Sequence, residues 1–145
     1  DRVAVVAFEG ERAEVLLEPT ASTSLAQERL RLLPVGGATP LAHGLWTAWE
    51  LVRTERLRDP LLRPTLVLLS DGGANVPMAK GADVRAELRA IAGRIRRDGI
   101  QSFVLDACGG GRASEELAGM ATALGARLRR LERMGAAALV EALEG

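Results

Sequence analysis

The 145-residue sequence has a single cysteine, no excess charge of either sign and no long apolar run. The one cysteine, Cys108, excludes an internal disulfide framework and fits a reducing compartment. Basic and acidic residues number 19 each, so nothing indicates a nucleic-acid or anionic-membrane partner. No stretch of about 18 apolar residues predicts a membrane span, and no basic-then-apolar segment predicts a leader. We therefore expect a cytoplasmic protein.

The composition is that of an ordinary globular domain, with 48% hydrophobic and 26% charged residues. We expect one domain over residues 1–145, which is long enough to bury a core. Neither an internal repeat nor a low-complexity tract is present. The chain passes from Asp1 and Arg2 directly into an apolar run, and we interpret this beginning as a cut end.

Short apolar runs predict most of the strands. Those at residues 3–8 and 66–69, and the stretch 102–105 with its three apolar residues after Ser102, are typical of strands buried on both faces of a sheet. Residues 13–17 follow the first run after a turn, which predicts a hairpin. The alternating, arginine-rich stretch at residues 126–131 predicts a short edge strand.

Helical spacing of apolar residues predicts the elements between and after these strands. One helix begins at Ser22 or Ser24, and another follows Pro40, with Thr39 as its N-cap. Further helices are expected at residues 82–97, at 114–124 with Ser114 as the cap, and at 135–143. The order β-β-α-α-β-α-β-α-β-α predicts an α/β fold. It is a doubly wound, mostly parallel sheet with one antiparallel edge strand and helices on both faces.

The stretch at residues 66–73 carries the most informative polar residue, Asp71. Four apolar residues run into Ser70 and Asp71, and two glycines follow. Open α/β sheets bind ligands at the carboxyl ends of their strands, and Thr39 is expected at the same edge. Hydroxyl and carboxylate oxygens suit Mg²⁺ or Mn²⁺. The structural alternatives are an aspartate that closes a turn and a threonine that caps a helix.

Residues 36–41 (Gly-Gly-Ala-Thr-Pro-Leu) and 68–77 (Leu-Leu-Ser-Asp-Gly-Gly-Ala-Asn-Val-Pro) resemble the von Willebrand factor A, or integrin I-like, family. Within it they are most similar to the C-terminal domain of the magnesium chelatase D subunit and its cobalt-chelatase relatives. The resemblance covers essentially the whole chain. It implies a metal-ion-dependent adhesion site in which Thr39 and Asp71 bind Mg²⁺ or Mn²⁺. An acidic residue of a partner protein completes such a site.

The chain departs from this family in one respect. The family's first strand ends in Asp-x-Ser-x-Ser, which supplies three further ligands, and no segment here matches it. In the family that strand lies between the strands that correspond to residues 3–8 and 66–69, so we expect a gap with two apolar edges. Three interpretations follow: the strand is truncated, which we favour; another chain supplies it; or the two neighbouring strands close up.

The resemblance also implies a function. It predicts a metal-dependent protein–protein interaction domain of a magnesium chelatase D-type subunit, with other chelatase subunits as partners. In this family the magnesium chelatase complex inserts Mg²⁺ into protoporphyrin IX in an ATP-dependent reaction of tetrapyrrole biosynthesis. No nucleophile–base pair or nucleotide motif is present, so we expect no catalytic residue. One alternative is a cobalt-chelatase-type subunit or another von Willebrand A adaptor of an ATPase. Another is a small metal-dependent phosphotransfer enzyme or hydrolase, for which Asp106 is the only further acidic ligand at that edge.

Several other residues have ordinary structural interpretations. His43 is expected to pack or to lie at the edge of the sheet, Cys108 to be a small buried residue, and residues 109–111 to form a turn. Asp106 either caps a turn or contributes to a partner surface. Trp46 and Trp49 are expected at core or near-core positions. A solvated edge is expected for Arg127, Arg129, Arg130 and Arg133, and the alternative is that these arginines dock an acidic partner.

Overall fold

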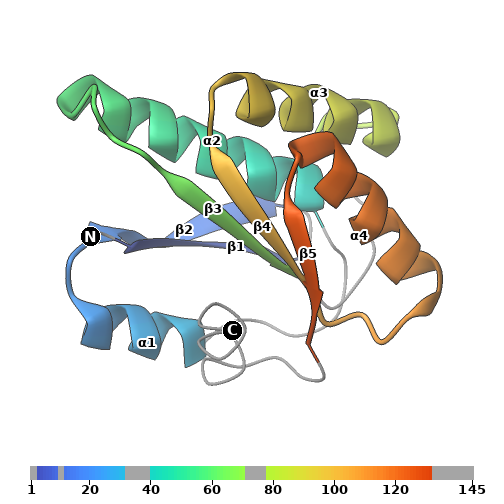
Figure 1. The fold of residues 1–145 in the computed structure, drawn as a ribbon, viewed down its shortest axis with the longest axis horizontal. Coiled ribbons are helices and arrows are strands. Elements are labelled where there is room, and N and C mark those ends of the chain that lie inside the picture. Colours follow the sequence, from blue (N-terminus) through green and yellow to red (C-terminus); the bar gives the residue numbers. More distant parts are fainter. Residues whose placement is uncertain (1–2, 10–11, 32–39, 71–77, 132–145) are drawn as a thin grey trace.

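The computed structural model describes residues 3–9, 12–31, 40–70 and 78–131. Figure 1 shows the elements β1 (Val3–Glu9), β2 (Arg12–Thr20), α1 (Thr23–Arg31), α2 (Leu41–Arg58), β3 (Thr65–Ser70), α3 (Val84–Arg97), β4 (Gln101–Asp106), α4 (Gly111–Leu124) and β5 (Arg127–Arg130). This order confirms the predicted α/β arrangement. The helix expected at residues 135–143 lies outside the described residues.

The described strands form two separate hydrogen-bonded sets. β1 and β2 pair antiparallel as the predicted hairpin, and β3, β4 and β5 form a parallel sheet in that order. In the described residues no ladder joins β1 to β3, and the β1–β2 ribbon is inclined to the parallel sheet (Figure 1). The sheet is therefore interrupted where the family's first strand was expected to be missing. The interpretation in which β1 and β3 close up is wrong.

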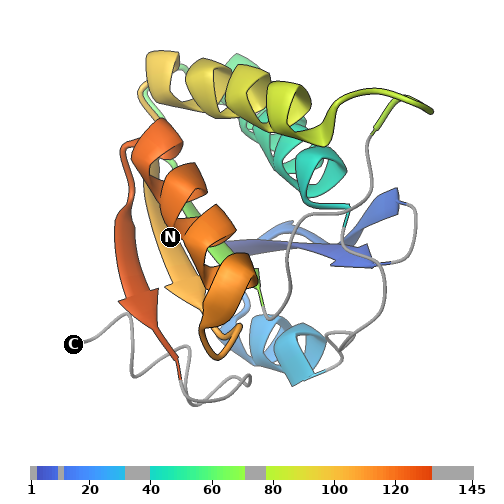
Figure 2. The same cartoon turned by 90° about the vertical axis from the view of Figure 1, so that its right-hand side faces the viewer.

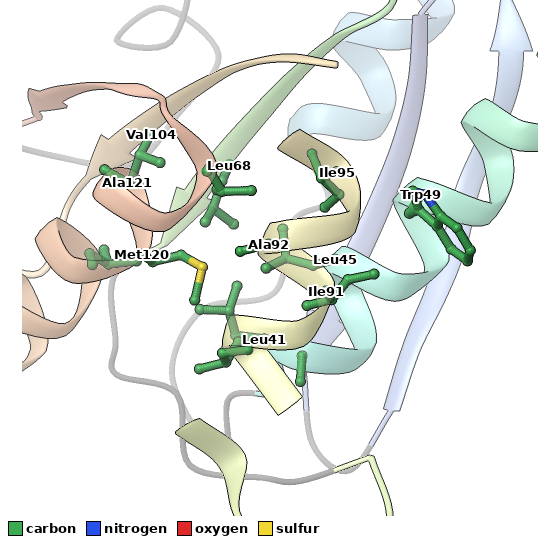
Figure 3. Close-up of a cluster of buried hydrophobic side chains, with 14 of the residues drawn as sticks. Leu41, Leu45, Trp49, Leu68, Ile91, Ala92, Ile95, Val104, Met120 and Ala121 are labelled. Carbon is green, nitrogen blue, oxygen red and sulfur yellow. The ribbon is translucent and has the colours of Figure 1, made fainter. Parts of the chain in front are cut away.

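One hydrophobic core lies between the parallel sheet and three helices. Leu68 of β3 and Val104 of β4 pack with α2, α3 and α4, and Figure 3 shows Leu41, Ile91 and Met120 gathered in the same cluster. Burial of each large apolar side chain contributes about 1.5–3 kcal/mol. Figures 1 and 2 show α1 on the other side of the β1–β2 ribbon from α2 and α3, so described helices lie on both sides of this ribbon.

Three helix starts test the predicted caps. Ser22 caps α1, since its Oγ accepts a hydrogen bond from the Leu25 N–H at 3.2 Å. Pro40 occupies the N-cap position of α2 instead of its first turn, and Thr39 lies outside the described residues. The predicted start of α4 at Ser114 is wrong, because the helix begins at Gly111. Glycines 109–111 have φ of 80°, 101° and 73°, which lets the chain turn from β4 directly into the helix.

Two elements extend beyond their predicted ends. β2 continues to Thr20, so the prediction that it stops at Leu17 is wrong. Its pairing with β1 shifts register between Val3 and Val6, and such an irregularity allows Pro19 to lie within the strand. α2 continues to Arg58, six residues beyond the last apolar position that indicated it, Val52.

Candidate functional site at the carboxyl edge of the sheet

The carboxyl ends of β3 and β4 lie side by side. Ser70 and Asp106 are partners in the parallel register and are the last residues of their strands. Both are buried, with 3% and 2% of their surface exposed. The Ser70 carbonyl accepts a hydrogen bond of 2.8 Å from the Ala107 N–H, which fixes the chain after β4 to the end of β3. Asp71 is the residue that follows Ser70 in the sequence.

The amino end of α2 is fixed to the hairpin. His43 accepts, at Nδ1, a hydrogen bond of 2.7 Å from the backbone N–H of Ala13 in β2. Pro40 and Leu41 are buried, and the Pro40 carbonyl accepts from the Gly44 N–H at 3.0 Å. The helix that follows Thr39 in the sequence therefore has a defined start. His43 is a packing residue, as predicted, and the hydrogen bond occupies its Nδ1.

Asp106 organises the turn after β4. Its Oδ1 accepts a hydrogen bond of 2.8 Å from the Cys108 N–H, while Ser114 Oγ accepts from the Gly110 N–H at 3.0 Å. Burial alone would raise the pKa of Asp106. Hydrogen bonds from the Cys108 N–H, the Ser114 hydroxyl and the Cys108 thiol, together with the positive charge of Arg130, outweigh burial and lower that pKa.

This network decides between the two interpretations of Asp106. Its carboxylate caps a turn within the chain, so it is already engaged by groups of the protein itself. The phosphotransfer alternative relied on Asp106 as a further metal ligand.

The remaining described candidates have structural roles, although two of them differ in detail from the prediction. Cys108 is half-buried instead of buried, and its thiol lies 3.7 Å from the Ser70 carbonyl. The turn before α4 ends at Gly110, because Gly111 is the first residue of the helix. Trp49 is buried, and Trp46 packs against the core. All four residues of β5 are exposed, including Arg127, Arg129 and Arg130. Arg133 lies outside the described residues.

The predicted metal ligands, Thr39 and Asp71, also lie outside the described residues. Their sequence neighbours Pro40 and Ser70 are placed and buried. Within the described ranges, no group of three or more His, Cys, Asp or Glu residues could hold a metal ion. Among the same residues, none of the helices combines the length and the apolar character that crossing a bilayer requires.

Two contacts of this region were missed at the level of sequence. The Ser114 hydroxyl was assigned to a helix cap, but it contacts Asp106 and Gly110. The partner of His43 is 30 residues away in β2. An aspartate at a strand end followed by a turn is a signal for the Asp106–Cys108 hydrogen bond, but it does not indicate the contact with Ser114. The second contact has no local signal.

Comparison with known proteins gives relatives of two kinds. The fold matches the VWA domain of SpRpn10, with a TM-score of 0.63 at 15% identity over 90% of this chain and 64% of that one. The sequence is 35% identical, over 98% of the chain, to the magnesium-chelatase 67 kDa subunit of Chlorobaculum parvum. It is 37% identical, over 94% of the chain, to the magnesium-chelatase 60 kDa subunit of Cereibacter sphaeroides. No protein-family model matches the chain.

The match covers one region of these larger proteins, since the chain spans 24% of the length of each of the two chelatase subunits. The structural match at low identity establishes the fold, and the sequence matches establish the relationship. The chain has the von Willebrand A fold and is homologous, along nearly its whole length, to one region of the magnesium-chelatase 60 and 67 kDa subunits.

Proposed function

We propose that the chain is a cation-dependent protein-interaction domain of a magnesium-chelatase D-type subunit and docks onto other chelatase subunits. The observation that carries the proposal is the edge at which Ser70 and Asp106 end their strands side by side. Asp71 follows Ser70 there, at the place where open α/β sheets bind ligands. The relationship to magnesium-chelatase subunits supports the choice of parent complex.

In this proposal Thr39 and Asp71 bind Mg²⁺ or Mn²⁺ through hard oxygen atoms. Two side chains are too few for such a cation, and Asp106 is engaged by the turn that follows it. The described residues therefore do not complete the site. A carboxylate of the partner subunit would take one of the positions left open.

We propose that a further strand fills the interruption between β1 and β3 and brings the other ligands. The edge of β3 that faces away from β4 has no hydrogen-bonded strand among the described residues. Three of the four residues of the apolar run, Leu66, Val67 and Leu69, are only partly buried. An additional strand would pair this edge and cover these side chains. The domain would then consist of that strand and residues 1–145.

Affinity capture tests the docking. A version of the chain extended through the residues that precede Asp1 is immobilised, and purified magnesium-chelatase subunits are applied with Mg²⁺ or with EDTA. We expect capture with Mg²⁺, its loss with EDTA, and its loss in Asp71→Asn, which keeps the shape of the side chain but removes its charge. The matched control is Glu50→Gln on the exposed side of α2. Capture that neither EDTA nor Asp71→Asn reduces would contradict the proposal.

A cytoplasmic location stays a prediction. A cobalt-chelatase-type parent would use the same edge of the sheet and would differ in the partner captured. No observation in the described structure favours it over a magnesium chelatase, whereas the relatives compared above are magnesium-chelatase subunits.

A further inference from the structure

A second surface combines stacked arginines, two tryptophans and two exposed leucines. It lies on α2, on the turn after α2 and on the last turns of α3. We call it the Arg–Trp surface, and it consists of Trp46, Trp49, Arg53, Arg56, Leu57, Leu61, Arg94 and Asp98.

Two of its guanidinium groups lie over aromatic rings. The centroids of Trp46 and Trp49 are 5.0 Å apart, and the Arg94 guanidinium lies 5.5 and 5.3 Å from them. The Arg53 guanidinium lies 4.8 Å from the Trp49 ring. A guanidinium that rests its flat side on a ring keeps its edge N–H donors available, and these bind carboxylates in pairs. The stacking thus orders the cations before any partner arrives.

Hydrogen bonds hold α2 and the end of α3 together beneath these arginines. Trp49 Nε1 donates to Asp98 Oδ2 at 2.7 Å, and Arg56 Nη1 donates to the Asp98 carbonyl at 2.7 Å. The positive charge is not balanced within α3, which carries five arginines and one glutamate. That glutamate, Glu87, accepts hydrogen bonds from the Met78 and Ala79 N–H groups near the opposite end of the helix. The Arg–Trp surface is therefore ordered, and the carboxylate that it contains, that of Asp98, accepts a hydrogen bond from Trp49.

Two large apolar side chains lie close in sequence to Arg53 and Arg56. Leu57, in the last turn of α2, is 85% exposed, and Leu61, in the turn that follows, is 88% exposed. Among the described residues these are the two most exposed large apolar side chains. A surface that joins apolar anchors to ordered arginines is typical of a protein-docking site.

The Arg–Trp surface lies away from the proposed cation site. α2 ends shortly before β3 begins, and α3 ends shortly before β4 begins. This surface therefore lies toward the amino ends of the parallel strands, whereas Ser70 and Asp106 end those strands. In Figure 1 the last turn of α2 is at the upper left, and the carboxyl ends of β3, β4 and β5 converge at the lower right.

We propose that the Arg–Trp surface docks an acidic peptide segment of a partner protein that also carries apolar side chains. Its carboxylates would pair with Arg53, Arg56 and Arg94. Its apolar residues would cover Leu57 and Leu61. A nucleic acid, which would bind through its phosphate backbone, would leave these two leucines exposed. The zero net charge of the chain also argues against a nucleic acid. This docking goes beyond the cation-dependent docking proposed above and does not depend on it.

The chain contains only two tryptophans, and both lie in this surface, so their fluorescence reports on its occupation. The probe is a dye-labelled synthetic peptide of repeated Glu-Glu-Leu-Asp units, and its anisotropy is followed in parallel. We expect saturable binding that changes the tryptophan emission. The double variant Arg53→Gln/Arg94→Gln should weaken binding about tenfold.

The matched control is Arg85→Gln/Arg89→Gln, which removes the same charge from exposed positions on the other half of α3. It should change affinity less than about twofold, because neither arginine belongs to the Arg–Trp surface. The variant Leu57→Ser/Leu61→Ser should weaken binding about fivefold with an unchanged circular dichroism spectrum. Equal losses in the two arginine variants, no loss in the leucine variant, or tighter binding of a uridine oligonucleotide would overturn the proposal.

The two proposals can fail separately. EDTA and Asp71→Asn should leave binding of this peptide unchanged, because the cation site is proposed at the opposite edge of the sheet. If either treatment abolished peptide binding, the independent Arg–Trp docking site would be wrong. If capture of chelatase subunits failed while the peptide still bound, only the cation-dependent function would be wrong.

Discussion

His43 and Ala13, 30 residues apart, are joined by a hydrogen bond of 2.7 Å from the Ala13 N–H to His43 Nδ1. This bond ties the first turn of α2 to β2. Replacement of His43 by glutamine moves the acceptor away from the Nδ1 position. The partly buried Ala13 N–H then loses its hydrogen-bond acceptor. We expect His43→Gln to lower the free energy of unfolding by about 1–2 kcal/mol.

Asparagine is the matched control, because its amide oxygen can take the place of Nδ1. His43→Asn should lose less than half as much stability as His43→Gln in urea-induced unfolding. Equal losses in the two variants would show that ring packing matters at this position and that the hydrogen bond does not.

Asp106 predicts a dependence of stability on acid. Its pKa in the folded chain lies below the ordinary value of 3.8, so the ionised carboxylate stabilises the fold. That contribution is fully present above the ordinary value and is lost as the pH falls through the lower, folded-state pKa. Asp106→Asn should therefore lose about 1–3 kcal/mol at neutral pH and show a shallower fall in stability below about pH 4. The measurement is urea unfolding at a series of pH values.

The same experiment distinguishes protonation of Asp106 from protonation of the other carboxyl groups. If the wild type and Asp106→Asn lost stability in parallel below the ordinary aspartate pKa, other carboxyl groups would cause the acid sensitivity. The assigned role of Asp106 would then be wrong, whatever the size of the loss at neutral pH.

Gly110 and Gly119 differ in whether their backbone conformation tolerates a side chain. Gly110 precedes α4 with φ of 101°, a conformation that residues with a side chain rarely adopt. Gly119 lies within α4, and a Cβ added there would meet no atom within 4 Å. We expect Gly110→Ala to destabilise the chain by about 1–3 kcal/mol and Gly119→Ala to stabilise it by about 0.5–1 kcal/mol. Thermal unfolding of both variants checks this, and the same sign in both would contradict it.

The strands were predictable because their signal is local. Residues 66–69 and 103–105 are continuous apolar runs, as buried parallel strands require, and both strands are present. Each strand extends one residue beyond its predicted range, 66–69 or 102–105, at either end, because backbone pairing does not stop where apolar side chains stop. The interruption between β1 and β3 followed from the missing family strand, and no composition or spacing in the chain itself would have indicated it.

The site was only partly predictable, because its contacts join distant segments. Ser114 carries the residue type of a helix cap, but the positive φ values at residues 109–111 start the helix earlier and turn its hydroxyl toward Asp106 and Gly110. The approach of Arg130 to Asp106 depends on the order of β4 and β5 in the sheet. Such pairings follow from topology and cannot be found from residue spacing.

The most direct test of the central claim is calorimetric titration of Mg²⁺ into the chain extended through the residues that precede Asp1. The account predicts saturable binding of one Mg²⁺ per chain, lost in Asp71→Asn and weakened in Thr39→Ala, with Glu50→Gln unchanged. Absence of binding, or binding that Asp71→Asn leaves intact, would contradict the claim that Asp71 and Thr39 hold the cation through which this domain docks.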